Sequence, residues 1–360
     1  MKIISVVGAR PNFMKIAPFI HEIEKHNLSH ENKIQHILVH TGQHYDEELS
    51  NFFFNDLGIS KPNYNLEVGS GTHGEQTARM LERIEKVLLS EKPDFVVVFG
   101  DTNSSMAGAL AARKLRINLA HIEAGMRNFD WNKPEEINRK IIDHISDLNF
   151  PPTESARKNL ENEGITDNVH LVGDVTCDVL KNNLERAKDK STFFSDFSVK
   201  EGEYLLFTCH KSINTDDSVR LKKIMTALSN LEHKIIFPLH PRTRNKIQEF
   251  NLSDLIEKEN IIVTEPLGYL DMLQALNGCQ KVVTDSGGIQ KEAFVLEKPC
   301  ITLRETEWVE TVTEGWNKII DLEKDEIVSL INEFMPTKAP NNIFGQSGVS
   351  ERIIGIIENF

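Results

Sequence analysis

Cysteine is scarce in this chain, and no stretch of it is both long and uniformly apolar. The four cysteines, Cys177, Cys209, Cys279 and Cys300, are widely separated and form no CxxC pair. The sequence therefore signals neither a disulfide framework nor a zinc site. We expect all four to be buried small apolar residues of a cytoplasmic protein. Because no run of about 18 apolar residues occurs, no membrane-spanning helix is predicted.

Positive charge is also in short supply, and several familiar motifs are missing. The chain carries 41 Lys and Arg against 54 Asp and Glu, a formal net charge of −13. Binding to nucleic acid is not expected, because it needs basic residues that displace counterions. No HExxH motif or His/Asp cluster predicts a metal, and neither GxGxxG nor GxxxxGK[ST] occurs, so the dinucleotide fingerprint and the P-loop are both missing.

What is present is a strong alternation of strand-like and helix-like segments. The 360 residues, 39% hydrophobic, suggest two domains or one large one. The N-terminal apolar run enters Gly8-Ala9-Arg10-Pro11 without a small-residue cleavage site, which indicates a strand and not a signal peptide. β-Branched apolar runs predict strands in the first half over 2–8, 35–42, 94–100, 118–125, 147–153 and 169–173. Amphipathic spacing predicts intervening helices, among them 11–26, 75–91 and 104–115.

The second half of the chain repeats this alternation of strand-like and helix-like segments. Its strands are predicted over 204–210, 234–240, 260–266, 280–288, 298–304 and 317–321. We place the domains at 1–175 and 176–345. A final helix over 346–360 could pack on either domain, the first being one of the two choices. Apolar runs separated by helices predict an α/β fold of two doubly wound domains, with parallel sheets covered on both faces. Two such domains leave a cleft, and ligands bind beyond the carboxyl ends of the strands.

Ionisable and glycine-rich segments follow the predicted strands in both halves. After 280–284 comes Asp285-Ser286-Gly287-Gly288, which precedes a helix-like segment. Such a helix start offers free N–H groups to a phosphate, although Ser286 could equally be an ordinary helix cap. Arg10 and Lys15 straddle the start of the first helix and could bind a diphosphate, or be surface cations.

Three carboxylates are candidates for proton transfer. Asp101 and Glu123 each end a strand, and Glu135 begins the helix-like segment PEEINR. Acids that converge on one cleft acquire different pKa values, as acid–base chemistry requires. The structural alternatives are an N-cap for Asp101 and complementation of the helix dipole for Glu135. His210 ends a strand and could donate to a leaving group, or be a buried histidine bonded to a carbonyl.

The ordered set of motifs resembles the non-hydrolysing UDP-N-acetylglucosamine 2-epimerase family. GARPNFMK, TGQHYD, GDTNS, HIEAGMR, PEEINR, His210, HPRTR and DSGGIQKEA follow one another over roughly residues 1–320. The resemblance implies a fold like that of GT-B glycosyltransferases, two Rossmann-like domains with the active site in the inter-domain cleft. It also implies a UDP-sugar substrate, no cofactor, a homodimer, and a supply of precursors for surface polysaccharide.

The resemblance also implies roles for individual residues. Asp101, Glu123 and Glu135 resemble the catalytic acids, and His210 the residue that stabilises departing UDP. The implied substrate contacts are Arg10, Lys15, Gln43, His44, Arg139, His240, Arg242, Ser286, Gly287, Gly288 and Glu292. The implied reaction eliminates UDP, forms a 2-acetamidoglucal and adds UDP back. Which acid removes the C2 proton and which delivers it stays open.

Several positions depart from the family pattern. Ile213 replaces a Glu after His210, Lys291 replaces a Glu in DSGGIQEEA, and Trp308 stands where TERPE has Arg. HPRTR occupies the place of an HxNP-type sequence in allosterically regulated members. These changes resemble the subgroup that epimerises UDP-2,3-diacetamido-2,3-dideoxyglucuronate. For the carboxylate of such a substrate, Lys211, Arg242 or Arg244 could supply a cation, or these residues could be ordinary surface cations.

Three other functions compete. A hydrolysing epimerase would have Arg at the position of Thr102 and lack HIEAG. A GT-B glycosyltransferase would need an acceptor pocket, and no basic amphipathic stretch suggests docking to a membrane. A nucleotide-sugar-binding regulator would have no need of Asp101, Glu123 and Glu135.

Overall fold

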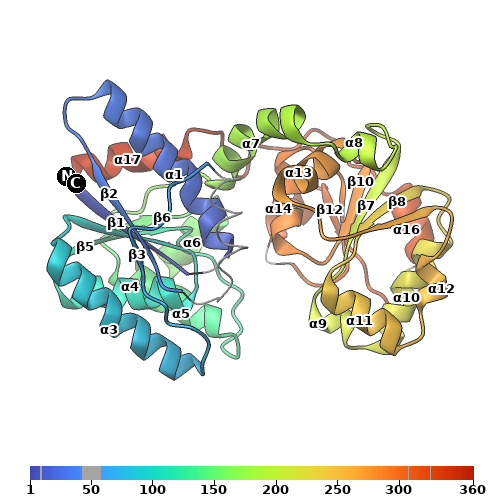
Figure 1. Cartoon of the computed structure of the whole chain (residues 1–360), viewed down its shortest axis with the longest axis horizontal. Helices are drawn as coiled ribbons and strands as arrows, with labels where there is room; N and C mark the ends of the chain where they lie inside the picture. Colours follow the sequence, from blue (N-terminus) through green and yellow to red (C-terminus); the bar gives the residue numbers. More distant parts are fainter. Residues whose placement is uncertain (9, 43–57, 307, 325) are drawn as a thin grey trace. The chain divides into compact units, whose positions relative to one another are not determined.

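A computed structural model gives the fold of the chain (Figure 1). It describes residues 1–8, 10–42, 58–306, 308–324 and 326–360, with Arg10 and Pro11 by their backbone alone. The described residues form two compact units. Unit 1 contains Met1–Lys181 and Asn342–Phe360, and unit 2 contains Asn182–Asn341. The sequence placed the first boundary after residue 175, directly before the helix over Thr176–Lys190 in which the division lies.

Unit 1 is built on a parallel sheet of six strands in the order β3-β2-β1-β4-β5-β6. The strands are β1 (Lys2–Val7), β2 (Gln35–His40), β3 (Tyr64–Asn65), β4 (Phe95–Phe99), β5 (Asn118–Ile122) and β6 (Leu148–Phe150). Every residue of β4 is buried, as its unbroken apolar sequence predicts for a strand covered on both faces. This order places β1 and β4 side by side at the point where the chain reverses direction across the sheet.

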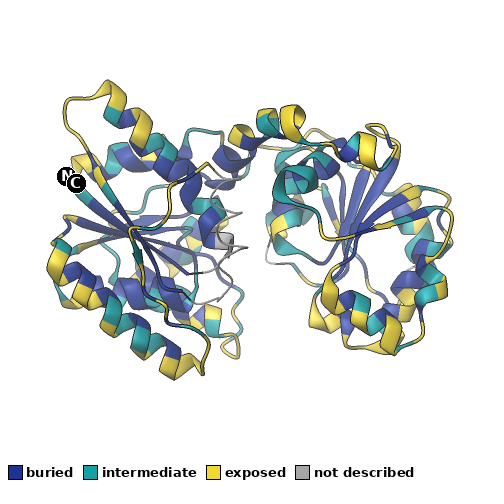
Figure 2. Ribbon diagram, in the orientation of Figure 1, coloured by how far each residue is buried: buried dark blue, intermediate teal, exposed yellow. Residues whose placement is uncertain are grey.

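Helices cover both faces of this sheet (Figures 1 and 2). Those of unit 1 are α1 (Arg10–Ser29), α3 (His73–Glu91), α4 (Asn103–Lys114), α5 (Pro134–Ile145), α6 (Glu154–Asn162) and α17 (Val349–Asn359). Ile3 packs in one apolar cluster with residues of α1 and α17, and Ile4 in another with residues of α3 and α4. Successive strand residues thus serve opposite faces, as the period of a β-strand requires.

Unit 2 repeats the architecture. Its parallel six-stranded sheet has the order β12-β11-β10-β7-β8-β9, which is the order of unit 1 read from the other edge. The strands are β7 (Tyr204–Thr208), β8 (Lys234–Pro238), β9 (Ile261–Thr264), β10 (Lys281–Thr284), β11 (Cys300–Thr302) and β12 (Asn317–Ile319). Both units are therefore doubly wound Rossmann-like domains, and the predicted fold class is confirmed.

Short and long helices flank the second sheet. They are α7 (Thr176–Lys190), which crosses from unit 1, α8 (Phe193–Asp196), α9 (Ser212–Thr215), α10 (Ser218–Ser229), α11 (Pro241–Glu249), α12 (Ser253–Ile256), α13 (Tyr269–Gly278), α14 (Gly287–Val295), α15 (Val309–Thr313) and α16 (Ile327–Glu333). Residues of α10, α11, α12 and α16 share one apolar cluster, and residues of α8, α13 and α14 share another. Of the helices in the described ranges, none has the length and apolarity needed to cross a bilayer.

One predicted strand was wrong, and one strand was missed. The segment 169–173 forms only a single bridge, between Asn149 and Val169, because it leaves the sheet at once toward Gly173, whose φ is 93°. The short strand β3 was missed, because two residues carry no readable alternation. All four cysteines are buried, as predicted.

One carboxylate of α7 caps the C-terminal helix. Asp178, on α7, is 6% exposed and accepts hydrogen bonds from the backbone N–H groups of Gly348 (2.5 Å), Val349 (3.3 Å) and Ser350 (2.8 Å) at the start of α17. These N–H groups have no carbonyl partner inside the helix. Ile353 and Ile357 of α17 then pack in the cluster that contains α1.

Replacing this capping residue should loosen α17. We expect Asp178→Ala to lower the free energy of unfolding by about 1–2 kcal/mol, because three helix N–H groups lose their acceptor. Urea denaturation measures the change. Asp189→Ala removes an exposed acid from α7, the helix that carries Asp178. This control should change the free energy of unfolding by less than about 0.5 kcal/mol. Equal effects would contradict the capping role.

Candidate functional site

The candidate residues of each unit lie near the point where the strand order of its sheet reverses. In unit 1, Gly8 follows β1, Gly100 and Asp101 follow β4, and Glu123 follows β5. In unit 2, His210 lies just beyond β7 and Ser286 just beyond β10, and these two strands are neighbours. The carboxyl ends of strands at such a switch point are where doubly wound sheets bind ligands.

Lys15 and Glu123 form an ion pair in unit 1. The Nζ atom of Lys15, on α1, donates to Oε2 of Glu123, and both side chains are largely buried. Gly100 lies against this pair, because a Cβ at that position would come within 3.1 Å of both Lys15 Nζ and Glu123 Oε2. The glycine, at a φ of 63°, thus leaves room for the two charged groups.

Glu123 itself has an unusual backbone. Its φ of 73° lies in the left-handed region, which is uncommon for a residue with a side chain. The carbonyl of Phe150, at the end of β6, accepts from the N–H groups of both Glu123 (3.1 Å) and Ala124 (3.2 Å). The neighbouring strand therefore holds the turn that aims the Glu123 carboxylate.

A second ion pair joins Asp101 and Arg139. Oδ2 of Asp101 lies 2.8 Å from Nε and 2.6 Å from Nη2 of Arg139. Burial opposes the charge on Arg139, but Asp101, Glu123 and Glu136 more than offset it, so the pKa of the guanidinium is raised. The N-cap alternative for Asp101 is wrong, because Thr102 caps α4 by accepting from the N–H of Ser105.

The structure distinguishes the two glutamates at the start of α5. Glu135 is exposed in the first turn of the helix, which is compatible with either of its two predicted roles. Glu136 is fully buried. One of its oxygens accepts from the N–H of Asn128 (3.0 Å) and lies 3.4 Å from Nη1 of Arg139. The other has no hydrogen-bond partner among the described residues.

Glu136 is a site residue that the sequence analysis missed. Its spacing contained a signal: residues three and seven positions apart share a helix face, and Glu136, Arg139 and Asp143 are so spaced. A buried carboxylate beside Arg139 gives that guanidinium a second anionic neighbour. The acids that the structure brings around Arg139 are therefore Asp101, Glu123 and Glu136.

A largely buried network lies behind the Glu123 turn. Asp143 faces Nδ1 of His121 and Nη1 of Arg127, both at 2.7 Å, and accepts from the N–H of Gly125 at 3.1 Å. Arg127 continues to Glu163 through two further hydrogen bonds. The bond from Arg127 helps to lower the pKa of Glu163 to about 2. The network ties α5 and α6 to the loop that follows β5.

In unit 2, a buried aspartate organises the loop that carries His210. Asp285 is fully buried, and its carboxylate accepts from the N–H groups of His210 (3.0 and 3.1 Å) and Lys211 (2.9 Å) and from Nδ2 of Asn214 (3.1 Å). Nδ1 of His210 lies 3.5 Å from Oδ1 of Asp285. Burial lowers the pKa of His210, and Asp285 counteracts this only in part.

The glycine-rich segment opens α14 as predicted. Ser286 is the N-cap residue, but its side chain makes no capping hydrogen bond, so capping does not explain why a serine stands there. Gly287 and Gly288 supply the first N–H groups of the helix, where an anion is favoured. Glu292, on the same helix, is half-buried, and burial raises the pKa of its carboxyl to about 7.

The HPRTR residues have structural partners. Nδ1 of His240 accepts from the N–H of Arg242 (3.1 Å) and caps α11, and its ring lies 5.4 Å from that of His210. Arg242 pairs with Asp216 (2.5 Å), and Arg244 pairs with Glu265 (2.6 Å). The remaining candidates, Gln43, His44 and the side chain of Arg10, lie outside the described residues.

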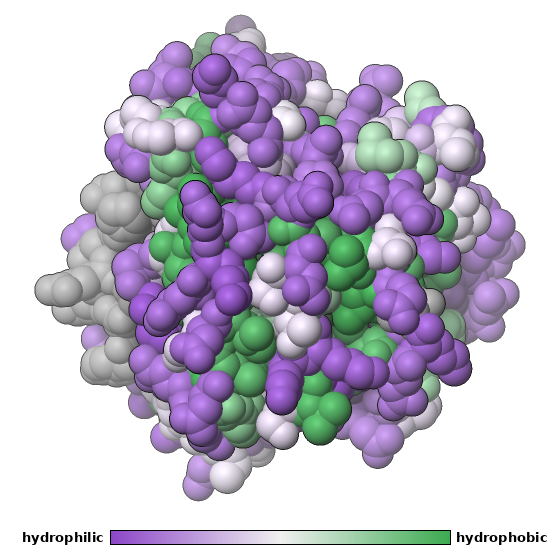
Figure 3. All heavy atoms as spheres, turned by 90° about the vertical axis from the view of Figure 1, so that its right-hand side faces the viewer, coloured by the Kyte–Doolittle hydropathy of each residue, from purple (hydrophilic) through white to green (hydrophobic). Residues whose placement is uncertain are grey.

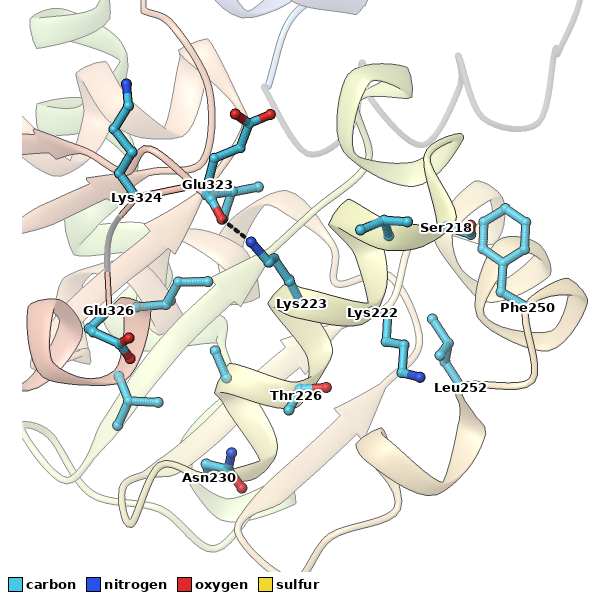
Figure 4. A pocket seen from close by; sticks show the side chains of 15 residues that line it. Ser218, Lys222, Lys223, Thr226, Asn230, Phe250, Leu252, Glu323, Lys324 and Glu326 are labelled. Carbon is cyan, nitrogen blue, oxygen red and sulfur yellow. Dashed lines mark hydrogen bonds between the residues drawn. The ribbon is translucent and has the colours of Figure 1, made fainter.

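Unit 2 also carries a groove of about 650 Å³ that runs along α10. Figure 3 shows polar and apolar side chains interspersed on this side of the molecule. The groove is lined by Lys222, Lys223 and Lys324 together with apolar residues of α10 and α16, and Lys223 donates to the carbonyl of Leu322 (Figure 4). None of the candidate site residues lines it. Among the described ranges, no group of His, Cys, Asp or Glu is arranged to hold a metal ion.

The buried network should dominate the stability of the loop after β5. We expect Asp143→Asn to lower the free energy of unfolding by about 3–5 kcal/mol, because Arg127 would keep a buried charge with less compensation. Chemical denaturation tests this. Glu161→Gln, which removes an exposed partner 3.5 Å from Arg157, should change stability by less than about 1 kcal/mol. Similar losses in both variants would argue against the network.

Comparison with known proteins shows the family of the chain. The family model for UDP-N-acetylglucosamine 2-epimerase matches residues 26–358. A UDP-N-acetylglucosamine 2-epimerase homolog from Methanococcus maripaludis is 47% identical and is aligned over 100% of both chains. The UDP-2,3-diacetamido-2,3-dideoxy-D-glucuronate 2-epimerase of Pseudomonas aeruginosa is 44% identical over 91% of this chain and 90% of its own.

A solved structure resembles the whole chain. The crystal structure of Methanocaldococcus jannaschii UDP-GlcNAc 2-epimerase in complex with UDP-GlcNAc and UDP has a TM-score of 0.86, with 43% identity over 100% of both chains. The match covers both units, and so includes the strand ends that carry the candidate residues. The chain belongs to the UDP-N-acetylglucosamine 2-epimerase family.

Proposed function

We propose that this protein interconverts UDP-N-acetylglucosamine and UDP-N-acetylmannosamine by non-hydrolysing epimerisation at C2. The observation that carries the proposal is the pair of carboxylate–cation contacts, Glu123 with Lys15 and Asp101 with Arg139, at the carboxyl ends of β5 and β4. A mere binding protein has no need of two such carboxylates. The similarity to relatives with this name supports the substrate class.

The chemistry explains why charged groups of both signs are needed. The C2 hydrogen of the sugar has no adjacent carbonyl, so its removal alone would leave an unstabilised carbanion. If the C1–O bond to UDP breaks as the proton leaves, the electron pair forms a C1=C2 double bond and the leaving group takes the bond electrons. The products are a 2-acetamidoglucal and UDP. Protonation of C2 on the other face and return of UDP to C1 complete the epimerisation.

The carboxylates of unit 1 supply the proton transfers in this proposal. Inversion at C2 needs a base on one face of the sugar and an acid on the other, so two groups must take part. Asp101 and Glu123 sit at neighbouring strand ends, and Glu135 lies four residues before Arg139 on an exposed helix turn. Lys15 and Arg139 hold the first two carboxylates in place and offset their mutual repulsion.

Unit 2 and the first loop supply the binding of the leaving group. The N–H groups of Gly287 and Gly288, with Ser286, would bind the diphosphate, and Arg10 would add charge. His210 stands on a loop fixed by Asp285, and the approach of a diphosphate would raise its pKa and favour donation to the departing oxygen. Glu292 would accept hydrogen bonds from the ribose hydroxyls.

A second substrate has a specific observation in its favour. The relative from Pseudomonas aeruginosa acts, by its name, on a diacetamido-glucuronate nucleotide. Of the three cations that the sequence offered for an extra carboxylate, Arg242 and Arg244 are already paired. Lys211 is exposed, and no carboxylate within the described ranges forms an ion pair with it. Lys211 is therefore our candidate for binding a C6 carboxylate.

The function is tested by epimerisation in deuterated water. Incubation with UDP-N-acetylglucosamine should give UDP-N-acetylmannosamine with deuterium at C2, because the proton returns from a group that exchanges with solvent. Magnetic resonance of the product measures the label. Free N-acetylmannosamine with UDP would indicate hydrolysis instead. Turnover of only the diacetamido-glucuronate nucleotide would select the second substrate.

The two paired carboxylates can be tested separately. Asp101→Asn and Glu123→Gln should each lower kcat by about 10²–10⁴, the usual contribution of a general acid or base. Steady-state assays give kcat and KM for each variant. Glu85→Gln, which changes an exposed acid on α3, is the matched control. If both site variants kept the kcat of the control, the proposed proton transfers would be wrong.

The raised pKa of Glu292 predicts a pH dependence of UDP binding. Its carboxyl has a pKa of about 7 without ligand, and accepting from ribose hydroxyls favours the ionised form. Affinity for UDP should therefore fall as the pH is lowered through 7. Calorimetry from pH 6 to 8 on the wild type and on Glu292→Gln isolates this effect, because the ionisation of UDP itself is common to both. Parallel pH profiles would contradict it.

A further inference from the structure

The structure brings together two residues that the sequence analysis marked as departures from the family pattern. Nζ of Lys291, on α14, lies 4.6 Å from the ring centroid of Trp308. The two residues are only 5% and 7% exposed. An ammonium over an indole face is attracted by the ring quadrupole, and the attraction is larger where water is excluded. Because the ammonium and the indole are in direct contact, we treat the two residues as one functional pair.

Trp308 is also bonded to the glycine-rich segment. Its Nε1 donates to the carbonyl oxygen of Gly287 at 2.9 Å. That carbonyl and the N–H of Gly288 belong to one planar trans peptide and point in opposite directions. Holding the carbonyl therefore fixes the direction of the Gly288 N–H. Because glycine has little conformational preference of its own, this peptide benefits from an external anchor.

Trp308 is itself held in place by hydrogen bonds of the surrounding loop. Oγ1 of Thr306 accepts from the N–H of Trp308 (2.9 Å) and donates to Oε1 of Gln290 on α14 (2.5 Å). On the other side, the carbonyl of Trp308 accepts from both the N–H (3.0 Å) and the hydroxyl (2.7 Å) of Thr311. The indole is thus positioned against α14 before any ligand arrives.

Lys291 adds a charge to this arrangement. It lies four residues after Gly287 on the same helix, one turn behind the N–H groups that open α14. A buried ammonium at that place increases the positive potential of the helix start, which the helix dipole already favours for anions.

We propose that Lys291 and Trp308 form a positioning pair that orients the Gly287–Gly288 peptide toward the diphosphate of a UDP-sugar. The inference rests on the proposed function, because it takes the start of α14 as the diphosphate site. The pair does not touch the substrate. It acts through the direction of the Gly287–Gly288 peptide and through the positive charge of Lys291. It therefore affects the binding of the phosphate part of the ligand alone.

The test compares UDP with uridine as calorimetric ligands. Trp308→Phe keeps a ring for Lys291 but removes the indole donor, and should weaken UDP binding about threefold to tenfold, the usual effect of losing one hydrogen bond. Lys291→Met should weaken UDP binding by a similar factor of about three to ten. The affinity for uridine, which lacks phosphate, should stay unchanged. In turnover, KM should rise while kcat changes little.

Two further variants separate positioning from general support of the fold. Lys291→Arg keeps a cation that stacks on an indole and should retain the wild-type affinity for UDP within about twofold. Trp316→Phe is the matched control, because the Trp316 indole also donates to a carbonyl, that of Lys338, at 3.0 Å. The double variant of Lys291→Met and Trp308→Phe should lose less than the two single losses combined, since the residues act as a unit.

The outcomes are distinguishable. If the site variants lost uridine and UDP alike, or bound UDP as tightly as Trp316→Phe does, the positioning role would be overturned while the proposed function stood. If the wild-type protein bound no UDP, the proposed function itself would fail and the inference with it. Selective loss of UDP, with uridine binding intact, is the result that the structure predicts.

Discussion

Each unit depends on one fully buried aspartate that ties together the loops at its strand ends. In unit 1, Asp143 joins His121, Gly125 and Arg127 behind the Glu123 turn. In unit 2, Asp285 receives the N–H groups of the His210 loop. A buried carboxylate is unfavourable unless donors surround it, so these loops can move little without leaving a charge uncompensated. The residues proposed for chemistry thus stand on loops that a rigid sheet and a buried charge both constrain.

Much of the fold could be predicted from sequence, because it rests on local patterns. Unbroken apolar runs such as 95–99 specify strands buried on both faces, and their alternation with helices specifies doubly wound sheets. The same logic placed Asp101, Glu123, His210 and Ser286 at strand ends. The net charge of −13 gave no sign of the local distribution of charge, in which Lys15 and Arg139 lie beside the acids and Lys291 lies one turn behind the start of α14.

The rest could not be predicted, because it depends on contacts between distant residues. Glu135 and Glu136 are adjacent in sequence, and only the packing of α5 decides which is buried beside Arg139. The contact of Lys291 with Trp308 joins positions that looked like separate changes. The segment 169–173 has the composition of a strand, but the turn at Gly173 withdraws it from the sheet. Arg242 looked free to bind substrate, and the structure pairs it with Asp216.

The central claim of the proposed function is that UDP leaves the sugar and returns to it, so that the C1–O bond breaks and reforms. Positional isotope exchange tests it most directly. UDP-N-acetylglucosamine labelled with ¹⁸O in the bridge between C1 and the β-phosphorus is incubated with the enzyme, and the phosphate region is followed by ³¹P magnetic resonance. If UDP departs and returns, the β-phosphate rotates and the label appears in its non-bridging positions at a rate no slower than epimerisation. Epimerisation with the label held in the bridge would contradict the account.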